Sequence, residues 1–408
     1  MSRVPFTVGF LGRRDAYQVP RALAEVDRLG VFLTGAYRDS VPRIIRACLP
    51  NRLKSRLETR YAPEIPAELI KGHWRIEAIQ HLSRLAQDSS NRSWSWANRA
   101  LSLAIRDRAR KHRENILTYE PYAWEAFTAE YDHHPKKVLF HFHLHPKFER
   151  ELITHDSILH PCGAAPWLSQ DARPEWDARV VDLWRFADQI ICASSFTKST
   201  LVAQGMPPER CTVVPYGIDL PEFNVSRIKS KGFSVLFVGS GIQRKGLHHL
   251  LAAWSAAKLP ADSKLTVVSR VVDPAVEALL AAAPRVEVRR GVTGNELNEL
   301  FRTSSLFVMP SILEGFGQVF LEALSHGCPV LGTPNTCLPD LGSEDAGIFL
   351  SPVGDVEALT RRLEDLAETL TRDDATGLRE EARKLAAKFS WERFRHRLVN
   401  LLEQPSSE

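Results

Sequence analysis

The sequence predicts an α/β protein built from two domains, each containing a parallel β-sheet. The chain has 408 residues, more than a single hydrophobic core usually serves. Short apolar runs in both halves are followed by glycine-containing turns and by helices, which is the pattern of parallel βα units. A polar segment at residues 224–232, rich in Lys, Arg and Ser, separates the halves. We therefore expect one domain at residues 1–223, a second at 224–388 and a terminal helix at 389–408.

The composition favours a globular enzyme. Hydrophobic residues make up 44% of the chain and charged residues 25%, and the formal net charge is only +4. The chain begins almost directly with an apolar strand and has no apolar run of about 18 residues, so we expect a cytoplasmic protein. The six cysteines include no C-x-x-C pair, and we expect them to be reduced thiols in the core.

The first βα unit has a strand at residues 6–11, a short turn and a helix at residues 19–29. Its turn lies at the C-terminal edge of the predicted sheet, where α/β proteins bind ligands. Adjacent arginines at this edge suit an anionic acceptor or a diphosphate. The turn residues are Gly12, Arg13, Arg14 and Asp15.

Two segments, residues 38–60 and 94–113, interleave basic and apolar residues. Helices of this kind, with Trp94 and Trp96 at one end of the second segment, suit an anionic membrane surface, here the inner face of the cytoplasmic membrane. The alternative is an amphipathic helix whose apolar stripe faces the core. The aromatic residues flank the basic run and do not alternate through it, so we expect no nucleic acid partner.

Three histidines, His141, His143 and His145, follow one another at every second position near the end of an apolar strand that we expect to end near His143. Alternation along a strand places them on one side, and such a set could ligate a metal. A metal-dependent hydrolase is therefore one functional alternative. No later pattern completes a ligand set, and a structural role for one or two of the histidines is also open.

The second domain begins with a buried strand at residues 233–239, which ends at Gly239. The loop after it contains Arg244, Lys245 and Gly246. Arginine offers a planar fork of donors and lysine a point charge. Together these two cations could stabilise a leaving diphosphate.

The most informative stretch predicts a strand at residues 305–309, a glycine-bearing turn and a helix at 317–326. The start of this helix can bind an anion such as a diphosphate through backbone N–H groups. Two carboxylates suited to sugar hydroxyls, Glu314 and Glu322, bracket the turn. The remaining turn and helix-start residues are Gly315, Phe316, Gly317, Gln318 and Val319.

Glu314 and Glu322, with seven residues between them and Gly315, Phe316 and Gly317 after the first, resemble the E-x7-E signature of family 4 retaining nucleotide-sugar glycosyltransferases. The likeness is strong from about residue 187 to the end and weak before it. It implies the GT-B fold, in which two Rossmann-like domains face each other across a cleft and a terminal helix crosses back to the first domain.

The resemblance also implies roles for the candidate residues. Glu322 would hold the donor ribose, and Glu314 the donor sugar or its developing positive charge. Arg244 and Lys245 would stabilise the diphosphate, and His143 or His145 would orient the sugar from the first domain. The donor site would also include Gly239 and the turn from Gly315 to Val319. Two departures are the single glycine in the first loop and the sequence Ser269, Arg270, Val271, where the family often has a glycine pair.

We therefore expect transfer of a sugar from a nucleoside diphosphate donor to a glycan, lipid-linked or small-molecule acceptor, with retained anomeric configuration. The chain has no D-x-D pair, so we expect no metal and no other cofactor. The alternatives are the metal-dependent hydrolase and a non-catalytic nucleotide-sugar-binding protein. A glycoside hydrolase or an epimerase would leave Arg244 and Lys245 without an evident use.

Overall fold

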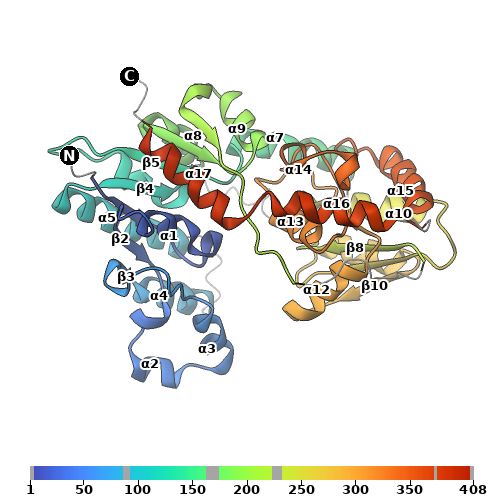
Figure 1. Cartoon of the computed structure of the whole chain (residues 1–408), viewed down its shortest axis with the longest axis horizontal. Helices are drawn as coiled ribbons and strands as arrows, with labels where there is room; N and C mark the ends of the chain where they lie inside the picture. Colours follow the sequence, from blue (N-terminus) through green and yellow to red (C-terminus); the bar gives the residue numbers. More distant parts are fainter. Residues whose placement is uncertain (1–3, 86–91, 162–173, 223–231, 372–374, 405–408) are drawn as a thin grey trace.

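The computed structural model describes residues 4–85, 92–161, 174–222, 232–371 and 375–404. These residues form two α/β lobes that lie next to each other along the longest axis of the molecule (Figure 1). Each lobe contains one parallel sheet with helices packed around it. The predicted fold class is therefore confirmed.

The N-terminal sheet has seven strands in the order β3-β2-β1-β4-β5-β6-β7. The order reverses between β1 and β4, so the carboxyl ends of these two strands flank a topological switch point, the usual ligand site of such sheets. The strands are β1 (Phe6–Gly9), β2 (Leu29–Thr34), β3 (Ile70–Gly72), β4 (Asn115–Tyr119), β5 (Lys137–His141), β6 (Gln189–Cys192) and β7 (Cys211–Val213).

The C-terminal sheet has six strands in the order β10-β9-β8-β11-β12-β13, and its switch point lies between β8 and β11. All the strand pairings are parallel, and the middle three residues of β8 and all three of β11 are buried, as expected for strands covered on both faces. The strands are β8 (Ser234–Val238), β9 (Lys264–Val268), β10 (Val286–Arg289), β11 (Leu306–Val308), β12 (Val330–Gly332) and β13 (Ile348–Leu350).

The helices that surround the sheets follow the strands along the chain. In the N-terminal lobe they are α1 (Gln18–Ala24), α2 (Arg43–Cys48), α3 (Asn51–Glu58), α4 (Trp74–Leu85), α5 (Arg92–His112), α6 (Trp124–Phe127), α7 (Pro146–Leu159), α8 (Pro174–Leu183) and α9 (Ser195–Val202). The remaining helices are α10 (Leu247–Ala256), α11 (Pro274–Ala282), α12 (Gly294–Thr303), α13 (Gln318–Ser325), α14 (Leu338–Leu341), α15 (Val356–Thr371), α16 (Ala375–Ala387) and α17 (Trp391–Glu403).

Two expectations about local structure were wrong. The helix predicted at residues 19–29 ends at Ala24, and Leu29 begins β2, which pairs with β1. The chain reverses at Asp27, which has a positive φ of 55°, so the apolar residues after it enter the sheet. Strand β5 ends at His141, so His143 and His145 lie in the following loop and strand alternation does not align them.

The second basic segment forms α5, and its apolar stripe faces the core. Ala97, Leu101, Ile105 and Ala109 recur at helical spacing and are fully buried. Ile105 lies so close to β1 that a Cβ on Gly9 would be 2.3 Å from its side chain. This stripe is therefore not available to a membrane, and the core-facing alternative is correct for residues 94–113.

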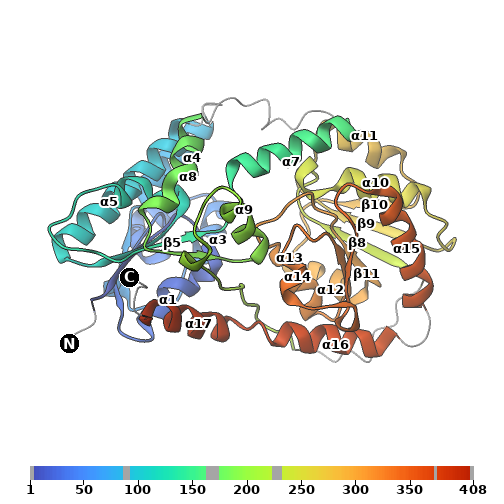
Figure 2. The ribbon, with the colours of Figure 1, turned by 90° about the horizontal axis from the view of Figure 1, so that it is seen from above.

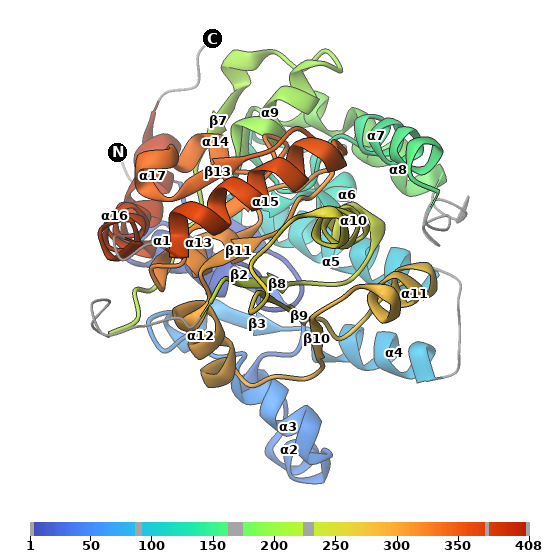
Figure 3. The same ribbon diagram turned by 90° about the vertical axis from the view of Figure 1, so that its right-hand side faces the viewer.

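The first basic segment, residues 38–60, folds differently. It contains the short helices α2 and α3, which project away from the N-terminal sheet (Figures 1 and 3). Pro42 and Pro50 precede these helices and occupy their N-cap positions. Ile44 on α2 is 81% exposed. Ile45, Leu49 and Leu53 are only partly covered by the protein, whereas Val41 and Leu57 are buried.

The terminal helix α17 returns to the N-terminal lobe and packs on α1. Ser390 caps its N-terminus by accepting a hydrogen bond from the Arg393 backbone N–H at 3.2 Å. Arg395 donates to Glu25 at 2.8 Å and to Gln18 at 2.7 Å. Figure 2 shows α16 and α17 along one side of the two lobes and α7 along the opposite side.

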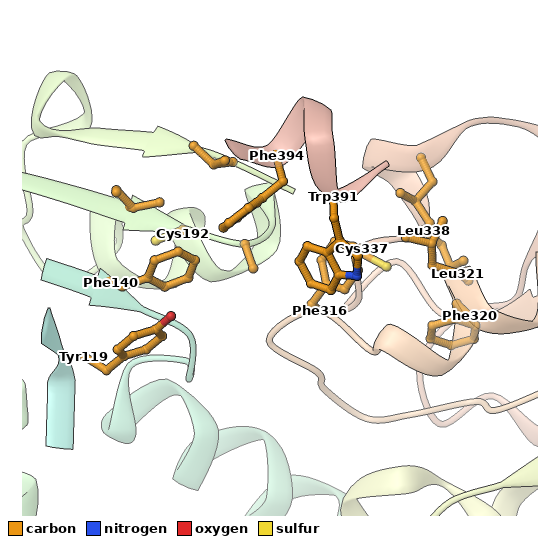
Figure 4. Close-up of a cluster of buried hydrophobic side chains, with 14 of the residues drawn as sticks. Tyr119, Phe140, Cys192, Phe316, Phe320, Leu321, Cys337, Leu338, Trp391 and Phe394 are labelled. Atoms are coloured by element: carbon orange, nitrogen blue, oxygen red, sulfur yellow. The ribbon is translucent and has the colours of Figure 1, made fainter. Parts of the chain in front are cut away.

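Aromatic side chains from both lobes form part of one continuous core (Figure 4). The Tyr216 ring lies 5.2 Å from that of Phe316 in the second lobe and 5.8 Å from that of Phe140 in the first, measured between centroids. Trp391 and Phe394 of α17 pack against Tyr216 as well. The lobes are therefore held together by buried apolar contacts next to the predicted site.

The cysteines agree only in part with the prediction of core thiols. Cys192, Cys211, Cys328 and Cys337 are buried free thiols, whereas Cys48 at the end of α2 is exposed. Cys162 lies outside the described residues, as does most of the predicted boundary segment 224–232. The helices of the described ranges include none with both the length and the apolar character needed to cross a bilayer.

Candidate active site

The loops that follow β8 and β11 meet at the switch point of the C-terminal sheet. The first loop contains a turn of 3-10 helix, Gln243–Lys245, that presents Arg244 and Lys245. Gly246 ends this turn with φ of 68°, and a Cβ there would lie 1.9 Å from the carbonyl oxygen of Pro310. Only glycine fits this approach, and it fixes the two cations beside the loop after β11.

Glu314 lies between the two cations. Its Oε1 is 2.6 Å from Arg244 Nη1 and 2.5 Å from Lys245 Nζ, and the residue is 7% exposed. Burial alone would raise the pKa of this carboxyl, but the attraction of Arg244 and Lys245 outweighs burial and lowers it. Glu314 is therefore a buried carboxylate anion whose neutralising partners come from the adjacent loop.

Glu322 lies in α13 and, unlike Glu314, has no cationic partner among the described residues. Among the described residues, none forms a hydrogen bond or an ion pair with its carboxylate, although the residue is half-buried. Burial raises the pKa of Glu322. A carboxylate held in this way has unused acceptor capacity, which the hydroxyl groups of a ligand could fill.

The start of α13 lies between these two carboxylates. Gly317 is its N-cap with φ of 84° and no side-chain cap, so the first N–H groups of the helix remain available to an anion. The side chain of Gln318 donates to the Gly217 carbonyl oxygen at 2.8 Å, and the Phe316 ring is buried against Tyr216. Those two side chains therefore connect the lobes, which leaves the backbone of Gly317, Gln318 and Val319 as the part that could contact a donor.

Gly239 ends the strand before the Arg244 loop, and its backbone N–H donates to the Val268 carbonyl oxygen at 3.0 Å. Ser269, where the resembled family often has glycine, accepts a hydrogen bond from the Gly241 N–H at 3.1 Å. The departure at Ser269 therefore supports the conformation of the loop that carries the cations. The role left to Gly239 is the space that a side chain would otherwise fill, because its backbone N–H is already hydrogen-bonded.

The N-terminal lobe meets the turn after Glu314 directly. The Gly315 carbonyl oxygen accepts hydrogen bonds from Ser194 Oγ at 2.5 Å and Thr197 Oγ1 at 3.0 Å. A Cβ on Gly315 would lie 2.0 Å from the carbonyl oxygen of Phe142. Since His143 follows Phe142 in the chain, the histidine loop lies directly against the turn after Glu314.

The three histidines have three different environments. His141 is buried, donates through Nδ1 to the His143 carbonyl oxygen at 2.8 Å, and has a pKa lowered by burial. His145 is buried at the start of α7, where its Nδ1 accepts from the Lys147 N–H, and burial lowers its pKa to about 4. His143 is 47% exposed, and its Nδ1 lies 2.7 Å from Glu120 Oε1. His143 is thus the histidine that a donor could reach.

Glu120 was not singled out from the sequence. It follows β4 and accepts hydrogen bonds from the backbone N–H groups of Phe142 and His143 at 3.4 and 3.1 Å. Burial favours the protonated form, but His143 outweighs it and lowers the pKa of Glu120. Its position directly after an apolar strand, at the C-terminal edge of the sheet, is the same signal that drew attention to the loop after β1.

The loop after β1 lies at the switch point of the N-terminal sheet. After Gly12, three residues without glycine's freedom, Asp15, Ala16 and Tyr17, have φ between 46° and 64°, a strained arrangement that is common at functional sites. The Arg14 guanidinium carbon lies 4.1 Å from the centroid of the Phe142 ring. Asp15 is hydrogen-bonded to the Tyr119 hydroxyl, and burial raises the pKa of Asp15. Arg13 is exposed.

A buried polar network links the two lobes behind the cation loop. Asp156 on α7 accepts a hydrogen bond from Gln243 Nε2 at 2.6 Å, and its oxygens lie 3.2 Å from His248 Nε2 and 2.8 Å from His249 Nε2 on α10. These partners outweigh burial and hold the pKa of Asp156 well below its ordinary value. No sequence pattern indicated this network, because its members are far apart in the chain.

A metal site at the three sequential histidines finds no support in this geometry. Among the described residues, the one group of potential ligand atoms that lie within 4.8 Å of one another consists of Asp156, His160 and His249. Asp156 already has hydrogen-bonding partners, and His160 Nε2 lies 3.0 Å from the Gly354 carbonyl oxygen. His141, His143 and His145 do not form such a group.

Two Rossmann-like lobes that join a cation and carboxylate cluster to a histidine loop define a protein of the GT-B glycosyltransferase class. Comparison with sequence families agrees. Residues 232–369 match the family described as glycosyl transferases group 1, and residues 59–222 match glycosyltransferase family 4. The chain therefore belongs to the group 1, family 4 glycosyltransferases.

Curated relatives are distant and share part of the chain. An MMP α-(1→4)-mannosyltransferase of Mycolicibacterium hassiacum is 26% identical over 59% of this chain and 61% of its own length. An O-antigen chain mannosyltransferase B of Escherichia coli is 25% identical over 65% of this chain and 74% of its own. The chain aligns with 61%, 61% and 58% of the length of three of the curated relatives that it matches.

Solved structures match over nearly the whole chain. Sucrose-phosphate synthase from Thermosynechococcus elongatus has a TM-score of 0.64 at 16% identity and covers 98% of this chain and 99% of its own. Anabaena HepE, solved in complex with UDP and glucose, has a TM-score of 0.59 at 14% identity with the same coverage. At these identities the likeness establishes the fold.

Proposed function

We propose that the protein transfers a sugar from a nucleoside diphosphate sugar to an acceptor hydroxyl group. The observation that carries this proposal is the cluster at the C-terminal switch point, where Arg244 and Lys245 share the buried carboxylate of Glu314. Two cations on a glycine-fixed loop, next to an uncapped helix start, are suited to a diphosphate. The carboxylates on either side are suited to the sugar and ribose hydroxyls.

Charge stabilisation would be the main catalytic contribution. During transfer, the bond between the anomeric carbon and the diphosphate oxygen breaks, a bond to the acceptor oxygen forms, and negative charge builds on the departing diphosphate. Arg244, Lys245 and the N–H groups at the start of α13 would stabilise that charge. Each such interaction contributes about 3 kcal/mol to lowering a barrier, so both cations affect turnover strongly.

The two glutamates would divide the recognition of the donor. Glu322, with no partner among the described residues, would accept hydrogen bonds from the ribose hydroxyls. Glu314 would contact the donor sugar and stabilise positive charge on its ring. When the diphosphate binds, it would compete with Glu314 for Arg244 and Lys245 and release the carboxylate toward the sugar.

His143 would orient the sugar from the N-terminal lobe. It is the exposed member of the histidine series, and its contact with Glu120 fixes the ring. His145, which caps α7, would act through the backbone of this loop. The phosphate or acceptor contacts of the loop after β1 would come from Arg14, which lies on Phe142 next to His143.

Retention of the anomeric configuration and independence from metals belong to the proposal. Glu314, the carboxylate proposed to contact the sugar, is paired with Arg244 and Lys245, so a double displacement through it as in a retaining glycoside hydrolase is not favoured. Arg244 and Lys245 supply the positive charge that a divalent ion supplies in other diphosphate sites.

The relatives support this assignment as analogies. Several are named as mannosyltransferases, and the structurally similar HepE was solved with UDP-glucose. A UDP-, GDP- or ADP-linked hexose is therefore the donor class to test, and glycans or lipid-linked sugars are the acceptors. The metal-dependent hydrolase is not favoured, because the three histidines have separate partners.

A panel of radiolabelled UDP-, GDP- and ADP-sugars tests the proposal. We expect slow donor hydrolysis by water with one donor, faster turnover with an acceptor, and the same rates with and without EDTA. Binding of a donor with neither hydrolysis nor transfer would favour a non-catalytic binding protein. Loss of turnover in EDTA, restored by a divalent metal, would contradict the metal-independent mechanism.

A further inference from the structure

A cavity of about 460 Å³ opens beside the loop after β1. This volume lies within the range of roughly 300–1,000 Å³ that is typical of small-molecule sites. Its walls come from the N-terminal lobe alone, from the loop after β1 and from α2, α3, α4 and the start of α5. Its apolar lining includes Leu11, Val41, Ile45, Leu49, Leu53 and Leu57.

The cavity explains the unusual pattern of the first basic segment. Ile45, Leu49 and Leu53 are only partly buried, because their side chains face this space and not the main core. The adjacent Ile44 points to solvent and does not line the cavity. The apolar stripe of α2 and α3 therefore covers a hollow. An apolar wall with no protein side chain packed against it can gain about 25 cal/mol per Å² by covering apolar ligand surface.

Arg14 connects the cavity with the candidate transfer site. Gly12 and Arg14 line the cavity, and the guanidinium group of Arg14 also lies on the Phe142 ring. The carbonyl oxygen of Phe142 is the atom that a Cβ on Gly315 would contact. A molecule in the cavity would thus pass Arg14 before its reactive end reached His143 and the donor.

Charge around the cavity favours an anion. Helices α2 and α3 carry five cationic side chains, Arg43, Arg46, Arg52, Lys54 and Arg56, and a single acidic one, Glu58. Arg56 and Arg60 also line the cavity, where the carboxylate of Glu77 pairs with Arg60. Among the lining residues, Arg14 and Arg56 have no carboxylate partner within ion-pair distance in the described part of the chain.

We propose that this cavity binds the hydrocarbon chain of an anionic lipid acceptor, with the acceptor phosphate at Arg14 and the sugar-accepting end toward His143. This inference rests on the proposed function, since it names the acceptor class of the same site. Apolar walls select the chain, and the cations select a phosphate over a neutral or cationic head group.

An individual lipid chain fits these observations better than attachment to a membrane surface. The lining faces a partly open hollow and not a flat face, and the apolar stripe of α5 is buried in the core. The exposed residue Ile44, together with the outward cations, would be enough for a weak encounter with a lipid surface. Specific binding would depend on Ile45 and not on Ile44.

A binding experiment tests the inference without any need for turnover. Trp74 and Trp94 line the cavity, so a dodecyl phosphate brominated on its chain should quench tryptophan fluorescence saturably below its micelle concentration. Inorganic phosphate should not. We expect Ile45→Asn to weaken the affinity at least about fivefold, because a polar side chain then replaces apolar contact surface. The matched variant Ile44→Asn should bind as the wild type does.

The outcomes are distinct. Absence of saturable quenching, or equal loss in Ile45→Asn and Ile44→Asn, would overturn the cavity assignment, and the second result would indicate surface association. Equal binding of a brominated dodecyl alcohol and the phosphate would contradict the role of Arg14. In activity assays, transfer to an alkyl-linked acceptor should fall in Ile45→Asn and remain at the wild-type rate in Ile44→Asn. If the proposed function is wrong, the wild type, Ile45→Asn and Ile44→Asn should all lack donor hydrolysis.

Discussion

Acidic side chains at the site have pKa values that their surroundings shift in opposite directions. Arg244 and Lys245 lower the pKa of Glu314, whereas burial raises that of Glu322, for which the described residues supply no counter-charge. The same division appears in the N-terminal lobe, where Glu120 pairs with His143 and Asp15 is hydrogen-bonded to a tyrosine. We therefore expect the carboxylates with cationic partners to maintain the site and Glu322 to be available to the donor.

Replacement of Glu322 by Gln should weaken function and stabilise the fold. Burial raises the pKa of Glu322, so the protonated form favours the folded state and the charged form opposes it. The contribution of the protonated side chain to stability is therefore full below the ordinary glutamate pKa and is lost as the pH rises through the raised pKa. We expect Glu322→Gln to raise Tm at pH 7, to flatten this part of the stability curve, and to raise the donor KM at least tenfold.

Thermal melts across pH and donor titrations check this prediction. Glu357→Gln, which changes an 89% exposed side chain on α15, is the control and should change neither quantity. A variant that melted lower than the wild type at pH 7 would mean that Glu322 has a partner within the protein.

The sequence identified most of the chemistry at this scale, because the candidate residues directly follow apolar strands. Arg244, Lys245 and Glu314 lie together as their positions at strand ends indicated. Asp156 was missed, since it lies in the middle of a helix and its partners are in the other lobe. Spacing along the chain cannot reveal a network of that kind.

At the scale of elements, the loop after β8 is defined by its glycine. Gly246→Ala should cost about 1 kcal/mol from the positive φ alone, and more because the new Cβ would contact the Pro310 carbonyl oxygen. The loop would then move away from Glu314, so we expect a lower Tm together with a fall in kcat of at least tenfold.

Gly294→Ala is the matched control, because a Cβ at Gly294 has no neighbour within 4 Å and its φ is not positive. It should leave both Tm and kcat close to those of the wild type. Wild-type activity in Gly246→Ala would show that the position of this loop is not needed for turnover.

The helices show why sequence patterns predicted only part of the fold. Residues 38–60 and 94–113 have similar mixtures of basic and apolar residues, yet α5 covers β1 whereas α2 and α3 border a cavity. The difference depends on what each stripe meets in the folded chain. The end of α1 was likewise misplaced, because Leu29 and its neighbours gain more from burial in the sheet than from continuing a helix.

At the scale of the whole molecule, the site requires both lobes. The Gly315 carbonyl oxygen is bonded to the N-terminal lobe, and Asp156 on α7 holds Gln243, which directly precedes Arg244. The aromatic core around Tyr216 and the return of α17 maintain this arrangement. Contacts between the lobes are therefore part of the catalytic geometry.

Asp156→Asn should show how much this contact contributes to the free energy of unfolding and how much to kcat. The lowered pKa of Asp156 means that its carboxylate stabilises the fold above the ordinary aspartate pKa, and that this stabilisation is lost as the pH falls through the lowered pKa. At neutral pH we expect a loss of roughly 1–3 kcal/mol in the free energy of unfolding, and a reduced kcat because Gln243 loses its partner.

Denaturant titrations at several pH values and steady-state kinetics measure the two effects. Glu151→Gln on the exposed side of the same helix is the control. An unchanged kcat in Asp156→Asn, at concentrations where the variant is folded, would show that this network supports the fold only.

The most direct measurement is donor turnover by wild type and Lys245→Ala, each confirmed to be folded by its melting curve. The label should be released from one of the UDP-, GDP- and ADP-sugars. We expect the wild type to consume one donor and the variant to do so about 10²–10³ times more slowly. The exposed control Arg361→Ala should match the wild type. Equal turnover by Lys245→Ala and the wild type would contradict the assignment of the donor site.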